Sequence, residues 1–190
     1  MTKTEDYNIN LTPNEAMDID EPMPVNIDIY LDDIFSIETT GTLITRVRLV
    51  ERWVDPRLSI SGERSDVRVE VVEPIWHPEG RFKHNADTHT KWDVTYLVNK
   101  GQVVKITEMT LNIYCQFDFT WFPWDWQECA LIYYDATYGE DQVMFKTGNY
   151  KIHSEVNLPQ WEIIKEIYEE MLTETDSGPS AAAVNANFVI

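Results

Sequence analysis

Long apolar runs are missing from this sequence of 190 residues, because no stretch approaches the ~20 consecutive apolar residues that cross a bilayer. The first residues also lack the basic start and apolar centre of a secretory signal. We therefore expect either a mature protein or a piece cut from a longer one. The final residues, Asn187-Phe188-Val189-Ile190, read as a strand that stops in mid-course, which favours the piece.

Basic residues are scarce. The chain has 15 Lys and Arg against 33 Asp and Glu, which gives a formal net charge of −18. A surface this acidic repels phosphate backbones, so we exclude nucleic acid as a partner. The charge favours cations, basic partners or simply a solvated extracellular surface. A divalent cation such as calcium would suit acidic loops, although the sequence indicates no position for it.

Cysteines and catalytic motifs are also few. The two cysteines, Cys115 and Cys129, permit either one disulfide or two buried thiols in a reducing compartment. The sequence has no nucleophile elbow, no His-Glu-x-x-His and no phosphate loop. The spacing of His77, His84 and His89 fits no metal-ligand pattern. We expect no enzyme, no cofactor and no resident metal.

Short segments of alternating apolar and polar residues make up much of the chain, and turn signals separate them. A hairpin is predicted where one such segment meets the turn Asn99-Lys100-Gly101 and a second returns. Repeated strands with turns between them favour an all-β sandwich or barrel. The predicted strands cover residues 25–31, 43–50, 66–71, 94–98, 103–114, 130–134 and 142–145.

The first 24 residues are polar, acidic and contain proline, and they form a segment of their own ahead of a domain at 25–190. Thr12 followed by Pro13 is typical of the start of a short helix, with Thr12 as the cap. Ser177-Gly178-Pro179-Ser180, with three alanines after it, predicts a flexible loop.

Residues 160–176 fit two structures. Trp161, Ile164, Tyr168 and Met171 recur at helical spacing, which indicates an amphipathic helix. Read as a strand, Trp161, Ile163, Ile167 and Met171 share one face with Lys165 and Glu169. Periodicity alone leaves both possibilities open.

The stretch from Cys115 to Cys129 carries the most specific pattern. It encloses thirteen residues, 116–128, with a Phe-Pro-x-Asp core and a glutamine two residues before the second cysteine. This resembles the signature loop of the Cys-loop receptors, the pentameric ligand-gated ion channels. The resemblance implies a disulfide between the two cysteines and a loop that couples the domain to a channel. The core residues of that coupling loop are Phe122, Pro123, Trp124 and Asp125.

Other stretches resemble landmarks of the same family, in the family's order. Residues 53–58 are similar to its W-x-D-x-R-L motif, and residues 76–79 with 85–87 to its loop A. Residues 101–115 are similar to the strand that carries loop E, and 137–139 to loop B. The resemblance implies an immunoglobulin-like β-sandwich of about ten strands over residues 25–190. It also favours a strand at 160–176, leading into loop C.

The residues expected at the family's ligand site depart from its aromatic pattern. Loop C, about 173–187, has neither an adjacent cysteine pair nor a tyrosine. Two cations stand where aromatics would hold a quaternary amine by cation–π contact, so we expect no acetylcholine site. An anionic or zwitterionic ligand suits them better, unless they are simply solvated. The equivalent positions are Lys83, Ala136, Tyr138, Arg48 and Ile106.

The resemblance implies the extracellular domain of a channel subunit at the plasma membrane, soluble when isolated. Its partners would be a small-molecule ligand, identical or homologous subunits in a pentamer, and a channel transmembrane domain. One alternative is a soluble secreted protein like the acetylcholine-binding proteins, which have a more polar loop tip. A β-sandwich enzyme or carbohydrate-binding module, with aromatics lining a sugar platform, is a second alternative.

Overall fold

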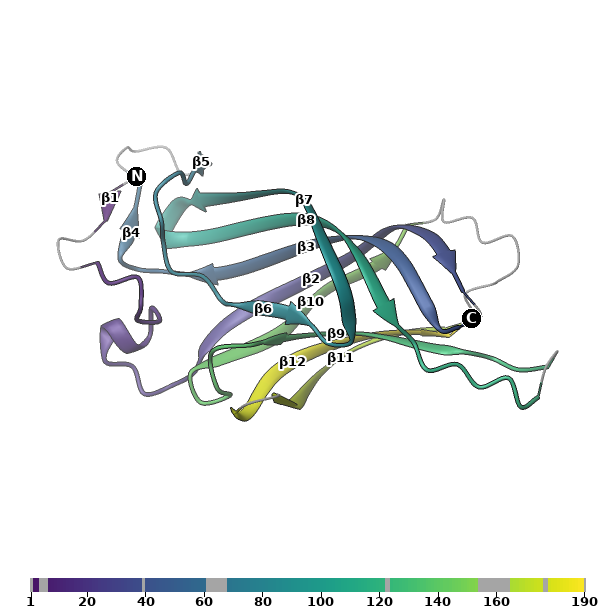
Figure 1. Cartoon of the computed structure of the whole chain (residues 1–190). Helices are drawn as coiled ribbons and strands as arrows, with labels where there is room; N and C mark the ends of the chain where they lie inside the picture. The colour runs from purple at the N-terminus through teal and green to yellow at the C-terminus, as the bar shows by residue number, and fades with distance from the viewer. Residues whose placement is uncertain are drawn as a thin grey trace.

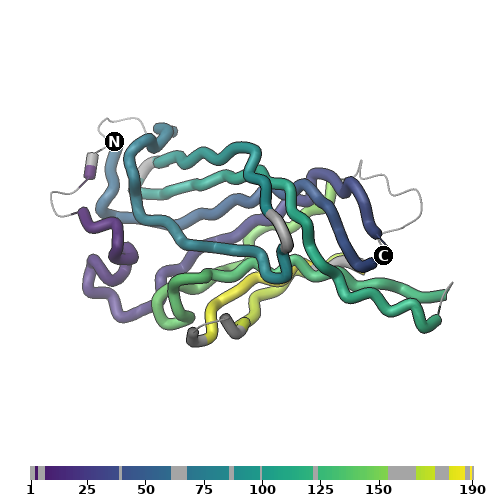
Figure 2. The backbone as a smooth tube through the Cα atoms, viewed as in Figure 1, coloured from purple at the N-terminus to yellow at the C-terminus, as the bar shows by residue number. Residues whose placement is uncertain are grey.

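The computed structural model describes residues 2–3, 7–38, 40–60, 68–121, 124–153, 165–175 and 178–189. Nearly all regular structure in these residues is strand, with two short 3-10 helices (Figures 1 and 2). The strands are β1 (Thr2–Lys3), β2 (Met23–Ile37), β3 (Thr42–Val54), β4 (Leu58–Ser59), β5 (Val69–Glu70), β6 (Gly80–Phe82), β7 (Asn85–Val98), β8 (Gln102–Tyr114), β9 (Glu128–Asp135), β10 (Val143–Ile152), β11 (Lys165–Thr175) and β12 (Gly178–Val189), and the helices are η1 (Glu15–Met17) and η2 (Asn99–Gly101).

Two sheets form the two layers of the fold. One has six strands in the order β10-β2-β3-β8-β7-β5, and the other has four in the order β11-β12-β9-β6. A further pair, β1 and β4, lies apart from both, so ten of the twelve strands in the described residues build the layers. Figure 1 shows the four-stranded sheet lying against the six-stranded one. The predicted all-β sandwich of about ten strands is confirmed.

Alternation along the strands builds the core. In β3, Leu43, Val47, Leu49 and Trp53 are almost completely buried, whereas the residues between them are mostly half-exposed. In β8, Val103, Leu111 and Ile113 repeat the pattern. Successive side chains of a strand point to opposite faces, so each of these strands presents one apolar face to the space between the layers.

The hairpin of β7 and β8 turns where the sequence predicts it. Lys100 and Gly101 both have positive φ, 61° and 75°. A Cβ atom on Gly101 would lie 2.3 Å from the carbonyl oxygen of Asp55. Glycine is needed here because the turn packs directly on the backbone that follows β3.

One edge of the six-stranded sheet is formed by a parallel pair, β2 with β10. The register shifts between Thr147 and Tyr150, and the Asp28 carboxylate fills the irregularity by accepting a hydrogen bond from the Asn149 backbone N–H at 2.9 Å. Arg52 also donates to this carboxylate. Although burial alone would raise the pKa of Asp28, the hydrogen bonds from Asn149 and Arg52 hold it below its usual range. The acid therefore stays ionised and holds β10 to β2.

The C-terminal part differs in one respect from the sequence prediction. The strand expected at 160–176 is confirmed over β11, while Trp161 and Ile164 lie outside the described residues. The flexible loop predicted from Ser177 onward is wrong, because β12 begins at Gly178 and pairs with both β11 and β9. Ala181, Ala182 and Ala183 are buried in this central strand, where small side chains fill the space between neighbouring elements.

The N-terminal segment contains a single 3-10 turn, η1. The Glu15 N–H donates to Thr12 Oγ1 at 3.1 Å, and the Thr12 N–H donates to Glu15 Oε2 at 2.8 Å. This reciprocal pair has the hydrogen-bond pattern of a capping box. The regular structure nevertheless extends over only three residues, and the residue at its N-cap is Asn14 and not the predicted Thr12.

The W-x-D-x-R-L stretch anchors the N-terminal segment to the sandwich. The guanidinium of Arg57 donates two hydrogen bonds of 2.8 Å to the carboxylate of Asp55, and both residues are buried. Arg57 also donates to the carbonyl oxygen of Asn8 at 3.0 Å and lies 4.5 Å from the centre of the Tyr7 ring. Tyr7 in turn donates to Asp55, and burial raises the pKa of Tyr7 to about 12. The motif is thus structural.

Arg57→Met should lower the free energy of unfolding by about 3–5 kcal/mol, because it leaves the Asp55 carboxylate buried without its cation. Urea unfolding followed by circular dichroism measures the loss. Asp55→Asn combined with Arg57→Met should recover part of it, and Arg81→Met, at an exposed arginine, is the control. A loss at Arg57 no larger than that of the control would contradict the role of the ion pair.

Candidate ligand-binding and coupling site

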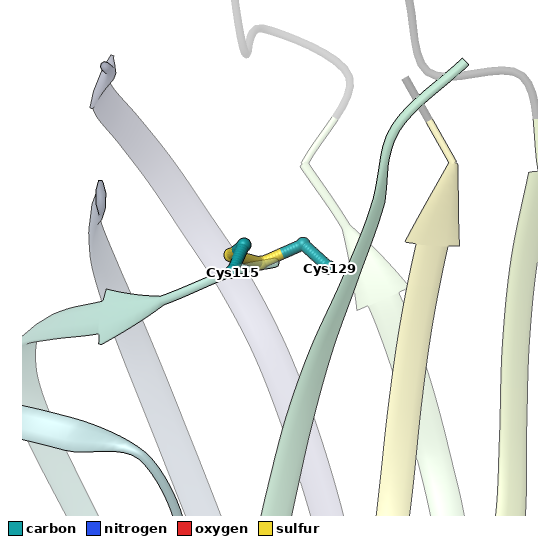
Figure 3. Close-up of a disulfide and its surroundings, with 2 residues drawn as sticks. All are labelled: Cys115 and Cys129. Atoms are coloured by element: carbon teal, nitrogen blue, oxygen red, sulfur yellow. A yellow bond between two sulfur atoms is a disulfide. The ribbon is translucent and has the colours of Figure 1, made fainter. Parts of the chain in front are cut away.

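A disulfide joins the two layers at one end of the sandwich. Cys115 follows the last residue of β8 in the six-stranded sheet, and Cys129 lies in β9 of the four-stranded sheet. Figure 3 shows the two side chains meeting between these strands. Both cysteines are buried, and the Cys115 N–H donates to the carbonyl oxygen of Gly41. The disulfide implied by the sequence pattern is present.

Gln127 explains the glutamine of the loop pattern. Its side chain is buried and pairs with the backbone of Asp118 on the opposite arm of the loop. The Asp118 N–H donates to Gln127 Oε1 at 2.7 Å, and Gln127 Nε2 donates to the Asp118 carbonyl oxygen at 2.9 Å. Gln127 Nε2 also donates to the Asp125 carboxylate. One amide therefore satisfies both backbone groups and holds the two arms together.

The loop projects from the sandwich and exposes aromatic side chains. Figures 1 and 2 show it extending beyond the end of the sandwich away from η1. Trp121, Trp124 and Trp126 are 76%, 85% and 69% exposed. They line a cavity of about 560 Å³ together with Asp125 and other residues of the loop. Phe122 and Pro123 lie outside the described residues. Such an aromatic cluster is typical of a surface that another apolar surface covers.

The end of β12 lies beside this loop. Val189 pairs with Glu128, the residue before Cys129. The last strand of the fold therefore reaches the same end of the molecule as the disulfide and the exposed tryptophans.

Three of the expected ligand positions lie in segments that follow strands of the four-stranded sheet. Lys83 follows β6, and its ammonium donates to the Thr173 hydroxyl on β11 at 2.8 Å. Ala136 follows β9 and donates its N–H to the carbonyl oxygen of Glu79 at 3.1 Å. Tyr138 is turned toward the core, where its hydroxyl accepts a hydrogen bond from Trp76 Nε1 at 3.0 Å. The structure thus brings Lys83 to the hairpin of β11 and β12.

The other two positions share the outer face of the six-stranded sheet. Arg48 pairs with Glu108 and Ile106 pairs with Val50 across β3 and β8, so both side chains point away from the core. Arg48 donates to the Asp32 carboxylate at 3.0 Å, and its guanidinium lies 4.9 Å from the centre of the Tyr30 ring. Arg48 is therefore positioned by an acid and an aromatic ring of β2.

Two contacts at these positions were not predicted from the sequence. Thr173 fixes the ammonium of Lys83, and Asp32 fixes the guanidinium of Arg48. Asp32 could have been singled out in the sequence, because Asp32 and Asp33 interrupt the alternation of apolar and polar residues in β2. The register of the strand shifts at this point. Thr173 gave none, since its contact with Lys83 joins residues 90 positions apart.

The family model of the neurotransmitter-gated ion-channel ligand binding domain matches residues 2–189. The chain belongs to this family.

Receptor subunits are similar to this Cys-loop receptor domain over most of its length. The human gamma-aminobutyric acid receptor subunit rho-3 is 28% identical over 148 residues, which are 72% of this chain and 32% of the relative. The rat glycine receptor subunit beta is 27% identical over 162 residues, 78% of this chain and 32% of the relative. The human acetylcholine receptor subunit epsilon is 31% identical over 136 residues, 66% of this chain and 27% of the relative.

The Cys-loop receptor domain spans about a third of the length of these relatives. All three relatives are named as receptor subunits. Across the described ranges no helix has the length and apolar character needed to cross a membrane. The same part of the chain contains no group of three or more His, Cys, Asp or Glu that could hold a metal ion.

Gln127→Leu should lower the free energy of unfolding by roughly 1–3 kcal/mol, because it leaves the backbone groups of Asp118 without their partner. The disulfide should still form, as mass spectrometry of the unreduced protein would show. Gln116→Leu, at an exposed glutamine of the same loop, is the matched control. Equal stability of the two variants in urea would show that the Gln127 amide does not hold the loop.

Proposed function

We propose that this chain is the extracellular ligand-binding domain of a subunit of a pentameric ligand-gated ion channel at the plasma membrane. The observation that carries the proposal is the disulfide-closed loop, which exposes Trp121, Trp124 and Trp126 beside the end of β12. A transmembrane domain that followed β12 would begin next to this loop. The loop could then transmit a ligand-induced movement to the pore.

The ligand site lies between neighbouring copies in this proposal. Lys83 and Ala136 belong to one layer of the sandwich, whereas Arg48 and Ile106 face outward from the other. A head-to-tail contact would place the first pair of one copy near the second pair of the next. Five such contacts close a ring if the rotation between neighbours fits.

Charge favours a ligand with a carboxylate. Lys83 and Arg48 both attract anions, and a guanidinium pairs with a carboxylate in a fixed geometry. Asp32, 3.0 Å from the Arg48 guanidinium, offers a place for an ammonium. Gamma-aminobutyric acid and glycine, for which two relatives are named, carry both groups. A small anion or zwitterion is therefore the ligand class that fits best.

Acetylcholine should give no binding heat with the folded domain at micromolar concentrations. Its quaternary amine would meet Lys83 and Arg48 in place of aromatic rings, and the cost of that repulsion grows as the site loses water. Isothermal titration calorimetry of the domain, with light scattering to establish whether it is monomeric or pentameric, makes the measurement. A micromolar dissociation constant would overturn the charge argument.

A chimaera of this chain with the transmembrane part of the human gamma-aminobutyric acid receptor subunit rho-3 should produce ligand-gated currents in oocytes. Gamma-aminobutyric acid, glycine and acetylcholine are the probes. Trp124→Ala should lower the maximal current severalfold without changing surface expression, because it removes an exposed contact to the channel. Met17→Ala, at an exposed apolar residue of η1, is the control.

Two results of the chimaera experiment would contradict the proposal. One is a chimaera that reaches the surface and passes no current with any of the probes, which would favour a soluble binding protein. The other is an equal effect of Trp124→Ala and Met17→Ala, which would remove the coupling role of the loop.

A further inference from the structure

A second cavity lies inside the sandwich, away from the interface positions. Its volume is about 440 Å³, which is in the range of small-molecule sites. It lies between the inner face of β3 and β8 and the edge strand β6. Arg48 and Ile106 point from the opposite face of the same sheet. The residues that line it from these strands include Leu49, Glu51, Phe82, Lys105, Thr107 and Met109.

A charged pair stands in the wall of this cavity. Glu51 and Lys105 are directly opposed across β3 and β8, and the two side chains point inward. The Glu51 carboxylate is buried and lies 3.3 Å from the Lys105 ammonium. Inward positions on these strands are otherwise mainly apolar, and a buried ion pair adds little stability over apolar residues of the same size. The pair therefore calls for an explanation other than packing.

The two carboxylate oxygens of Glu51 differ in their hydrogen-bond partners. Oε1 accepts a hydrogen bond from the Tyr133 hydroxyl at 3.0 Å. Oε2 is buried with no hydrogen bond, although Lys105 neutralises its charge. Burial and the neighbouring Glu51 charge raise the pKa of Tyr133 well above its usual value, so the phenol remains a donor. A Cβ atom on Gly80 would lie 1.9 Å from the Tyr133 hydroxyl, so β6 closes tightly over this ring.

The charges select the class of ligand. A simple cation in the cavity would be repelled by Lys105, and a simple anion would be repelled by Glu51. A molecule with an ammonium and a carboxylate on one carbon atom matches two opposite charges 3.3 Å apart, because each of its groups then faces its counter-charge. The remaining walls, Leu49, Phe82 and Met109, are apolar and suit an apolar side chain.

Access to the cavity is from the side of β7. Thr88 and Thr90 line it and are exposed, as is Arg81 on β6. Thr90 pairs with Met109, so its side chain is on the inward face, near the edge where the second sheet ends. From this side a ligand can reach Lys105, whose side chain is 21% exposed, while the Glu51 carboxylate behind it is buried.

We propose that this cavity is a binding site, within a single copy of the chain, for a free α-amino acid with an apolar side chain. Its ammonium inserts between Lys105 and Glu51 Oε2, which accepts no hydrogen bond, and its carboxylate pairs with the displaced Lys105 ammonium. The site is separate from the interface site under Proposed function and needs no second copy.

Calorimetry with three probes tests the charge requirement. L-Leucine should bind the isolated domain, while isopentylamine and 4-methylpentanoate, which each lack one of its charged groups, should bind at least about tenfold more weakly. Lys105→Met should reduce leucine binding by a similar factor, with circular dichroism to confirm the fold. Lys151→Met, at an exposed lysine of β10, is the matched control and should leave leucine binding unchanged.

A blocking variant keeps the test independent of the buried pair. Thr90→Phe should fill the mouth of the cavity and abolish leucine binding, while Thr110→Phe, on the outer face of the same sheet, should not. No heat with leucine would overturn the proposal. Equal binding of the three probes, or leucine binding that survives Thr90→Phe, would overturn it as well. A failed channel chimaera would leave this result unaffected, because the site requires no pore.

Discussion

The structure depends on one covalent constraint, the disulfide that ties β8 of one layer to β9 of the other. It closes the sandwich at the end where the chain crosses between the sheets. The thirteen residues between the two cysteines form a loop that projects from the fold. Gln127 holds the arms of that excursion by pairing with the backbone of Asp118. The tryptophans at the tip have no place in the core, and their exposure follows from the geometry of the closed loop.

The opposite end of the sandwich is fastened by different chemistry. There the buried pair of Asp55 and Arg57 ties the N-terminal segment to the chain after β3, and Trp53 and Trp76 meet edge to face with ring centres 5.8 Å apart. Between the two ends the strands run the length of the molecule. A domain fixed at both ends moves as a unit, which suits the proposed transfer of movement from an interface to a pore.

Much of the fold could be predicted from the sequence, because alternation along β2, β3 and β8 reports directly which face of each strand is buried. The closed loop was equally readable from its two cysteines and Phe-Pro core. The strand of alanines was missed, since alanine has little preference for strands and Gly178-Pro179 signals a turn. The candidate ligand site was harder to predict from the sequence. The partners of Arg48 and Lys83 depend on which strands become neighbours, and no local pattern contains that information. Glu51 could have been recognised as an inward-facing acid, because it lies two residues after Leu49 on the same strand.

The parallel pairing of β2 with β10 has a consequence for biosynthesis. Val25 is paired in register with Phe145, so β2, which has β3 as its first neighbour, gains its second neighbour only from a segment made more than a hundred residues later. Contacts so distant in sequence form slowly, because the intervening chain must be ordered first. During that interval the edge of β2 presents unpaired backbone groups, which attract other strands. The open edge of β2 therefore favours self-association until β10 emerges.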